Sequence, residues 1–92
     1  MNKKTSFGTL EILLERDGEV ISEFLTFEKE GRGHIHKKWE ICYIVGGSGI
    51  IVNGDEKVDV KKGDVCKIPP GNNHWMIPKE NLEILIVYSE NI

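Results

Sequence analysis

The sequence predicts an all-β fold of the double-stranded β-helix, or jelly-roll, type, and three observations support this prediction. Short runs rich in Val, Ile, Phe and Thr recur at regular spacing, which is typical of strands. Turn signals built from Gly, Asn, Asp and Pro separate these runs. No stretch shows a convincing helical period, and the nearest one, Thr9 to Leu14, lies inside an expected β-hairpin. The 92 residues predict one domain, residues 1–92.

The first two strands are expected at Phe7 to Glu15 and at Glu19 to Glu28. Leu10, Ile12 and Leu14 alternate along the first strand and so share one of its faces. Arg16-Asp17-Gly18 supplies the hairpin turn between the two strands. A charged, glycine-containing loop, Glu28 to Gly33, follows the second strand.

The remaining strands are short and closely spaced. We expect them at His34 to His36, Glu40 to Val45, Ile50 to Val52, Lys57 to Val60, Val65 to Ile68, Trp75 to Ile77 and Leu82 to Tyr88. Gly46 to Gly49 is expected to form a tight turn or bulge, and Asn53-Gly54 is the strongest short hairpin signal in the chain.

Composition excludes several classes of function. The 12 basic and 15 acidic residues give a formal charge of −3, and the lysines are scattered among acids, so no nucleic-acid partner is expected. The N-terminal MNKKTSFGTL has no apolar run after its lysines, which argues against a signal peptide, and no run is long enough for a membrane helix. The two cysteines, Cys42 and Cys66, form no paired framework, so we expect a reduced, cytoplasmic protein.

All three histidines lie in two segments, Gly31 to Gly47 (GRGHIHKKWEICYIVGG) and Gly63 to Pro78 (GDVCKIPPGNNHWMIP). His34 and His36 share one side of an expected strand, with Cα atoms roughly 6–7 Å apart. On a straight strand Glu40 would lie roughly 13 Å beyond His36. We therefore expect the chain to turn between them, at residues 37–39.

His74 must reach the same point from another strand. The turn signal PPGNN immediately precedes it. Imidazole and carboxylate are metal ligands, and three histidines with one glutamate suit a first-row transition metal. The sequence thus predicts one divalent transition metal per chain, with His34, His36, Glu40 and His74 as ligands.

These two segments resemble the two motifs of the cupin family. The first motif, G-x5-HxH-x3,4-E-x6-G, is matched from the first histidine onward, through Gly47. The second, G-x5-PxG-x2-H-x3-N, is matched by Gly63, Pro69, Gly71 and His74. Glu28 replaces the leading glycine of the first motif and Pro78 replaces the final asparagine of the second. Neither difference affects a candidate ligand.

The resemblance implies a cupin barrel with one bound metal, commonly iron, manganese, nickel, cobalt, copper or zinc. Cupins include dioxygenases, sugar and sugar-phosphate isomerases, epimerases, decarboxylases and lyases, and some bind ligands without catalysis. Two hypotheses therefore remain open. The first is a mononuclear-metal enzyme that acts on a small polar metabolite by oxidative or isomerase/lyase-type chemistry. The alternative is a non-catalytic metal- or sugar-binding module.

Strand alternation places Cys42, Ile44 and Met76 on the interior side with the ligands, so we expect them to line the cavity. Cys42 is then the only titratable interior side chain besides the ligands, and a small buried hydrophobe is the usual role of a free cysteine. This favours oxidative chemistry or binding over isomerisation, which needs a group for proton transfer. The sequence assigns no catalytic residue and no organic cofactor. Lys37 and Lys38 lie near the expected mouth, either as solvated turn residues or as contacts for an anionic substrate.

The chain is also expected to form a homodimer. If Glu40 faces inward, then Ile41, Tyr43 and Val45 form an apolar outer face, and the last strand, LEILIVY, is apolar on both faces. The N-terminal strand is one possible cover for this surface. A second subunit is the better one, since monomers rarely expose large apolar patches, and the resemblance implies dimers of this kind.

Overall fold

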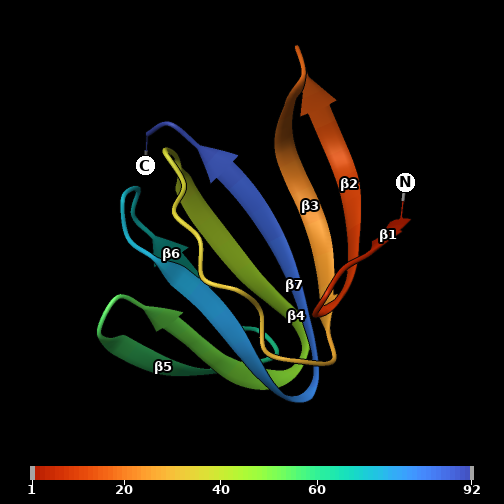
Figure 1. Cartoon of the computed structure of the whole chain (residues 1–92), viewed down its shortest axis with the longest axis vertical. Helices are drawn as coiled ribbons and strands as arrows, with labels where there is room; N and C mark the ends of the chain where they lie inside the picture. Colours follow the sequence, from red (N-terminus) through yellow and green to blue (C-terminus); the bar gives the residue numbers. More distant parts are fainter. Residues whose placement is uncertain (1, 92) are drawn as a thin grey trace.

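The computed structural model describes residues 2–91, and every regular element within that range is a β-strand (Figure 1). The strands are β1 (Asn2–Lys4), β2 (Gly8–Arg16), β3 (Glu19–Phe27), β4 (Trp39–Asn53), β5 (Glu56–Lys61), β6 (Val65–Ile68) and β7 (His74–Ser89). The described range contains no helix that could cross a membrane. The predicted all-β fold is confirmed.

Two long strands, β4 and β7, form the centre of the molecule (Figure 1). All pairings are antiparallel, in the order β1-β2-β3-β7-β4-β5, with β6 also on β4. The first half of β4 pairs with β6 and with the end of β7, whereas its second half pairs with β5 and with the start of β7. The β4–β7 ribbon bends between these halves, and the bend folds the sheet back on itself.

The bend coincides with the glycine-rich segment of β4. Register shifts occur between Ile44 and Gly49, which is the signature of β-bulges. Gly47 has a φ of 73°, and a Cβ atom there would collide with the backbone carbonyl oxygens of Glu80 and Asn81. Only glycine satisfies both conditions. Of the tight turn or bulge expected at Gly46 to Gly49, the structure has the bulge, which bends one continuous strand.

Strand boundaries differ from the expected ones mainly where the chain bends. The strands expected at Glu40 to Val45 and Ile50 to Val52 are one continuous strand, β4. Those expected at Trp75 to Ile77 and Leu82 to Tyr88 are likewise one strand, β7. The expected strand His34 to His36 is reduced to an isolated bridge between His34 and His74. β1 was not expected. The expected bounds of β6 agree with those observed.

The core follows the predicted alternation. Glu40, Cys42 and Ile44 are buried, whereas Tyr43 and Val45 on the opposite face are 49% and 40% exposed. The apolar core comprises Leu25, Phe27, Cys42, Ile44, Ile51, Val60, Ile68, Met76, Leu82, Ile84 and Ile86. These residues come from both halves of the bent sheet, so their packing holds the two halves together.

Candidate metal centre

The four predicted ligands converge at one point. The candidate ligand atoms of His34, His36, Glu40 and His74 all lie within 4.8 Å of one another. Glu40 and His74 are each only 1% exposed, while His34 lies on the exposed side of the group. One ion can therefore contact all four side chains and still be reached from outside.

Backbone hydrogen bonds hold the loop that carries the first two histidines. The N–H of His34 donates to the carbonyl of His74 at 3.1 Å, and the N–H of His74 donates back at 3.0 Å. The N–H of Gly71 donates to the carbonyl of His36 at 3.0 Å. The segment that ends at His74 thus holds the loop before β4 in place. The position of the first two histidines therefore depends on the second motif as well as on the first.

The bend of the central ribbon brings Glu40 and His74 together. Glu40 pairs with Tyr88 near one end of the ribbon, and His74 pairs with Asn53 at the other end. After the bend, Nε2 of His74 lies 2.5 Å from Oε2 of Glu40, and Nε2 of His36 lies 3.3 Å from the same oxygen.

The donor set fits a cation. Nε2 of His36, Nε2 of His74 and Oε2 of Glu40 are buried, close together and without a partner in hydrogen-bond geometry. Such orphaned polar atoms are costly unless something else satisfies them. The Nδ1 of His74 contacts the carbonyl oxygen of Asn72 at 3.1 Å, the support that ligating histidines usually have. His74 therefore turns Nε2 toward the group.

Burial and the Glu40 charge act in opposite directions on the two inner histidines. Burial lowers the pKa of His36, against an opposing contribution from Glu40. Burial would also lower the pKa of His74, but contact with the Glu40 carboxylate, its charge and the Asn72 carbonyl raise it overall. A divalent cation bound here would replace protons as the partner of Glu40.

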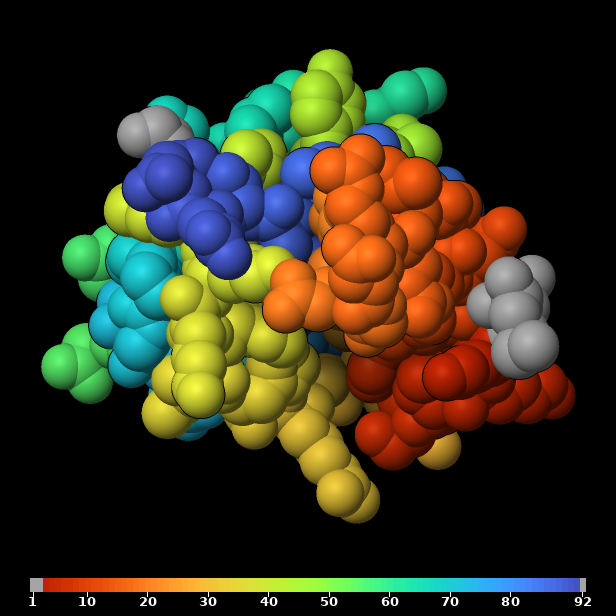
Figure 2. All heavy atoms as spheres, turned by 90° about the horizontal axis from the view of Figure 1, so that it is seen from above, coloured from red at the N-terminus to blue at the C-terminus, as the bar shows by residue number. Residues whose placement is uncertain are grey.

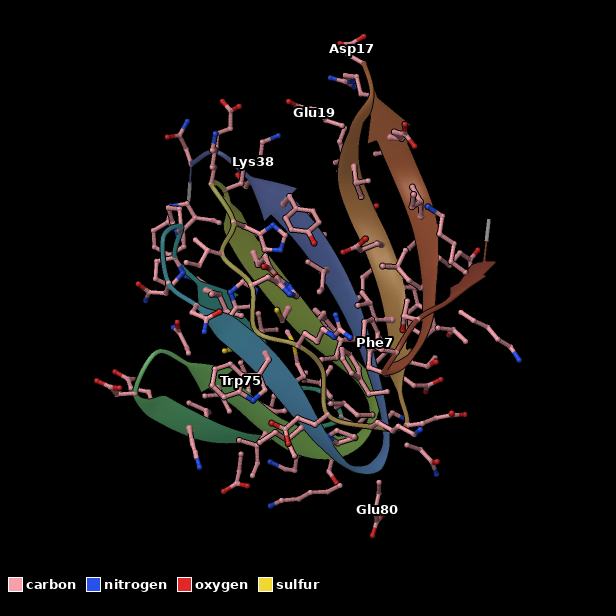
Figure 3. All side chains as sticks on the ribbon, in the orientation of Figure 1. Phe7, Asp17, Glu19, Lys38, Trp75 and Glu80 are labelled. Atoms are coloured by element: carbon pink, nitrogen blue, oxygen red, sulfur yellow. The ribbon has the colours of Figure 1, made fainter. Side chains whose placement is uncertain are left out.

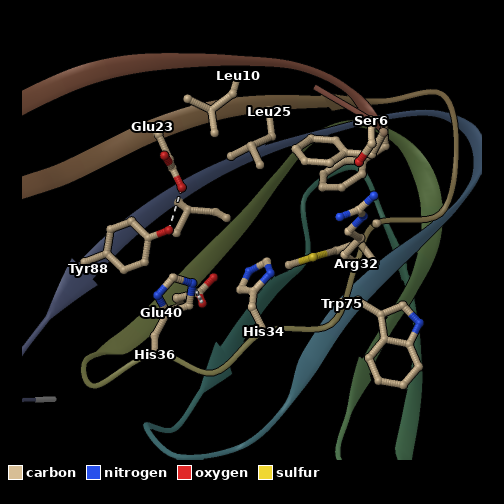
Figure 4. A pocket seen from close by; sticks show the side chains of 15 residues that line it. Ser6, Leu10, Glu23, Leu25, Arg32, His34, His36, Glu40, Trp75 and Tyr88 are labelled. Atoms are coloured by element: carbon tan, nitrogen blue, oxygen red, sulfur yellow. Dashed lines mark hydrogen bonds and ion pairs between the residues drawn. The ribbon is translucent and has the colours of Figure 1, made fainter. Parts of the chain in front are cut away.

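A cavity of about 330 Å³ opens directly above the group (Figure 4). Leu10 and Leu25 lie across it from His34 and His36, and Arg32 and Ser6 lie at one end. The other apolar lining residues are Phe7, Phe27, Trp75, Met76 and Ile86. The wall facing the candidate ligands is therefore predominantly apolar.

The three residues expected to line this cavity are placed differently from one another. Met76 lines it. Cys42 and Ile44 are both 0% exposed and lie in the core, outside the set of cavity-lining side chains. Burial, followed by the charges of Glu40 and Cys66, raises the pKa of the Cys42 thiol. Cys42 thus behaves as a small buried hydrophobe.

Two polar side chains that line the cavity were missed by the sequence reasoning. Glu23 and Tyr88 line the cavity, and the Tyr88 hydroxyl donates a hydrogen bond of 2.5 Å to Glu23 (Figure 4). Burial, then the Glu23 and Glu40 carboxylates, raises the pKa of Tyr88, which keeps it a neutral donor. The sequence did contain a signal for Glu23. In the strand EVISEFLTF it lies on the same face as Leu25 and Phe27, which predicts that it points inward with them.

The two lysines near the mouth line the same recess, and one of them is held in an ion pair. Lys38 forms an ion pair of 2.7 Å with Glu19, across the opening between β3 and the start of β4 (Figure 3). Lys37 and Lys38 both line a second recess of about 430 Å³ at the same opening. The indole N–H of Trp75 donates to Glu30 at 2.9 Å, so its polar edge is engaged away from the ligands.

A family model described as a cupin domain matches residues 23–88 of the chain. The chain belongs to the cupin family. All four candidate ligands of this cupin fall inside the matched range, together with Glu23 and Tyr88.

Known proteins similar to this cupin include two dioxygenases. An acireductone dioxygenase of Leptospira biflexa is 36% identical over 80 residues, covering 83% of this chain and 44% of the relative. A 1-hydroxy-2-naphthoate 1,2-dioxygenase of Nocardioides sp. is 28% identical over 60 residues, covering 65% of this chain and 16% of the relative. This cupin therefore spans less than half the length of either relative.

Among solved structures, this cupin is similar to a predicted oxalate decarboxylase from Thermotoga maritima. The TM-score is 0.77 with 26% sequence identity, over 87% of this chain and 77% of the other. The similarity extends over β-strands from both halves of the bent sheet and supports the jelly-roll architecture.

Proposed function

We propose that this cupin is a mononuclear-metal dioxygenase that acts on a small organic molecule. The observation that carries the proposal is the position of the candidate ligand group, which lies at the floor of a mainly apolar cavity. A structural metal site is closed, whereas a reactive one stays accessible to substrate. Apolar walls also exclude water from a reactive substrate.

His34, His36, Glu40 and His74 would hold the metal, whose identity among iron, manganese, nickel, cobalt, copper and zinc is open. When bound, the metal would supply Lewis acidity and, for a redox-active ion, the capacity to activate dioxygen. The names of the two relatives support the oxidative alternative, since both are dioxygenases.

The protein's own side chains bind and orient the substrate. The leucine and phenylalanine side chains pack against its apolar part. Arg32 and Ser6, at the end of the cavity opposite Glu23 and Tyr88, offer a cation and a hydroxyl to an anionic or polar group (Figure 4). The substrate is therefore a small amphipathic molecule.

Glu23 and Tyr88 favour a second candidate, an isomerase or lyase. The sequence argument against proton transfer rested on the lack of an interior acid or base, and these two residues supply one. Oxidative chemistry remains the first choice because of the relatives. A non-catalytic metal- or sugar-binding module is the remaining alternative.

One assay distinguishes the dioxygenase, the isomerase or lyase, and the non-catalytic binding module. The iron(II)-loaded protein is incubated with enediols, catechols and hydroxylated aromatic acids, with oxygen consumption and products followed together. Oxygen uptake coupled to product supports the dioxygenase. Oxygen-independent conversion with deuterium incorporated from solvent would support the isomerase or lyase, and binding without turnover the binding module. A His36→Ala, His74→Ala variant is the control, since its conversion should fall to background.

The cytoplasm remains the location that we propose. Cys42 and Cys66 are both free thiols, as is usual in a reducing compartment.

A further inference from the structure

Glu23 is an unusual residue for its place in the fold. Glu23, Leu25 and Phe27 are the three buried residues of β3, with Glu23 only 8% exposed. An apolar side chain at position 23 would continue the core, whereas a carboxylate there must be removed from bulk water. A residue that breaks the local pattern in this way points to a functional requirement.

The Glu23 carboxylate retains acceptor capacity toward the cavity. Among residues 2–91, the one side-chain hydrogen bond that it accepts comes from the Tyr88 hydroxyl, to Oε1. An ionised carboxylate offers about four acceptor positions. Tyr88 also packs against the ring of His36, with centroids 5.3 Å apart, and pairs with Glu40 in the ribbon. Glu23 is therefore held in place beside the candidate metal group, with an oxygen left for a ligand.

Glu23 and Tyr88 stand at the junction of two recesses. Both residues, with His36, line the apolar cavity and also the second recess, whose other lining residues are Glu19, Val20, Lys37 and Lys38. That second recess is charged. The segments that form it meet on one face of the molecule, where β3 (orange), the 34–40 segment (yellow) and the end of the chain (blue) come together (Figure 2). Glu23 thus connects the ligand cavity to water.

We propose that Glu23, positioned by Tyr88, binds and deprotonates a hydroxyl group of the ligand, so that this site takes enols and phenols. The inference rests on the proposed metal centre and names the substrate class of that site. The ligand O–H bond breaks, its electron pair stays on the ligand oxygen, and the proton forms an O–H bond with Glu23. The proton stays on Glu23 while the ligand is bound and returns to water through the second recess when the ligand leaves.

The same arrangement disfavours other ligands. A ketone, ether or hydrocarbon cannot donate to Glu23 and would seal a buried carboxylate against an apolar surface. A ligand whose metal-binding group is already an anion brings a second negative charge toward it. The hydroxyl donor is therefore the feature that the cavity selects.

Zinc-loaded protein provides a test without turnover, with catechol as the probe. Affinity is measured by calorimetry between pH 6 and 9 for the wild type and for Glu23→Gln, which keeps an acceptor for Tyr88 but loses the basic carboxylate. We expect Glu23→Gln to bind catechol about tenfold more weakly at pH 6, as for loss of a hydrogen bond to a charged group. The deficit should shrink toward pH 9, where catechol ionises without help.

Pyridine-2-carboxylate, a chelator without a hydroxyl, is the matched probe. Its affinity should be unchanged or higher in Glu23→Gln, and Tyr88→Phe should show the same selectivity with a smaller loss for catechol. Equal affinities of wild type and Glu23→Gln for catechol, a deficit independent of pH, or an equal loss for both probes would overturn the role of Glu23. Failure of the wild type to bind zinc would instead overturn the metal centre, and the inference with it.

Discussion

At the scale of single residues, Glu40 makes the closest contacts within the candidate metal centre. Its carboxylate is 1% exposed and lies within contact distance of two imidazoles that come from separate parts of the chain. Without a cation this carboxylate has no partner in hydrogen-bond geometry on Oε2. A cation bound here would therefore couple metal binding to the fold at this residue.

The purified protein should contain about one transition-metal ion per chain. The His36→Ala, His74→Ala variant removes two of the four ligands that converge here, so its metal content should fall below about a tenth of wild type. Elemental analysis after dialysis measures this. Lys37→Ala, next to a ligand but outside the group, is the control and should keep its metal. Equal occupancy in the double variant and the wild type would refute the assignment.

Metal affinity should fall as the pH drops through about 6.5, because ligating imidazoles must be neutral. Glu40 helps to raise the pKa of His74, so protons compete with metal for this ligand from above 6.5 downward. Burial lowers the pKa of His36, so protons compete there only at lower pH. Calorimetry from pH 8 to pH 5, corrected for buffer ionisation, tests this. A binding constant that does not change over that range would exclude histidine ligation.

The sequence predicted the convergence of the ligands better than it predicted their surroundings. The spacing of His34 and His36, the turn before Glu40 and the turn before His74 were each sufficient to place a side chain. The Glu23–Tyr88 pair depends instead on β3 lying beside β7. That pairing joins strands about sixty positions apart, which local patterns do not encode.

At the level of the elements, the bend of β4 has a sharp test in Gly47→Ala. The substitution forces an alanine into a φ of 73° and drives its Cβ into the backbone of the facing strand. We expect unfolding free energy to fall by about 2–4 kcal/mol, measured by urea denaturation. Gly54→Ala is the matched control, since its φ is 61° but nothing lies within 4 Å of the added atom. It should cost about 1 kcal/mol. Equal costs would show that the close approach is unimportant.

Strand existence was predictable and strand continuity was not. Residues 46–49 and 78–81 read as turns because they contain glycine, proline and asparagine. In the fold these two segments lie opposite each other in one ribbon, where Gly49 pairs with Pro78. Because the two segments face each other, they form one bend in a continuous ribbon. Neither segment alone indicates that the other lies opposite it.

At the level of the whole molecule, the outer face of the sheet is apolar and open. Neighbouring strands β6, β4, β7 and β3 place Val65, Tyr43, Leu85 and Phe24 in one row. Tyr43 is 49% and Val65 52% exposed. β2 extends the sheet beside β3 and so does not fold over this face. Of the two covers considered from the sequence, the second subunit is the one that we still propose.

The protein should therefore be a dimer of 10.4 kDa chains at micromolar concentration. Tyr43→Lys with Val45→Lys places two charges on the apolar face and should yield monomers in sedimentation equilibrium. Val58→Lys is the control, because Val58 is similarly exposed, at 41%, but lies on β5. A wild-type monomer at high concentration would refute the dimer, and a double variant that remains dimeric would place the interface on another face.

The bent ribbon also sets an order of events during synthesis. Three of the four candidate ligands emerge by residue 40, but the fourth lies at the start of the last strand. That strand must pair along β4 and bend before Glu40 and His74 meet. A partly made chain offers an incomplete and unshaped set of donors. Binding of an ion by all four side chains would therefore have to follow the pairing of the last strand, so only a fully synthesised chain could hold it.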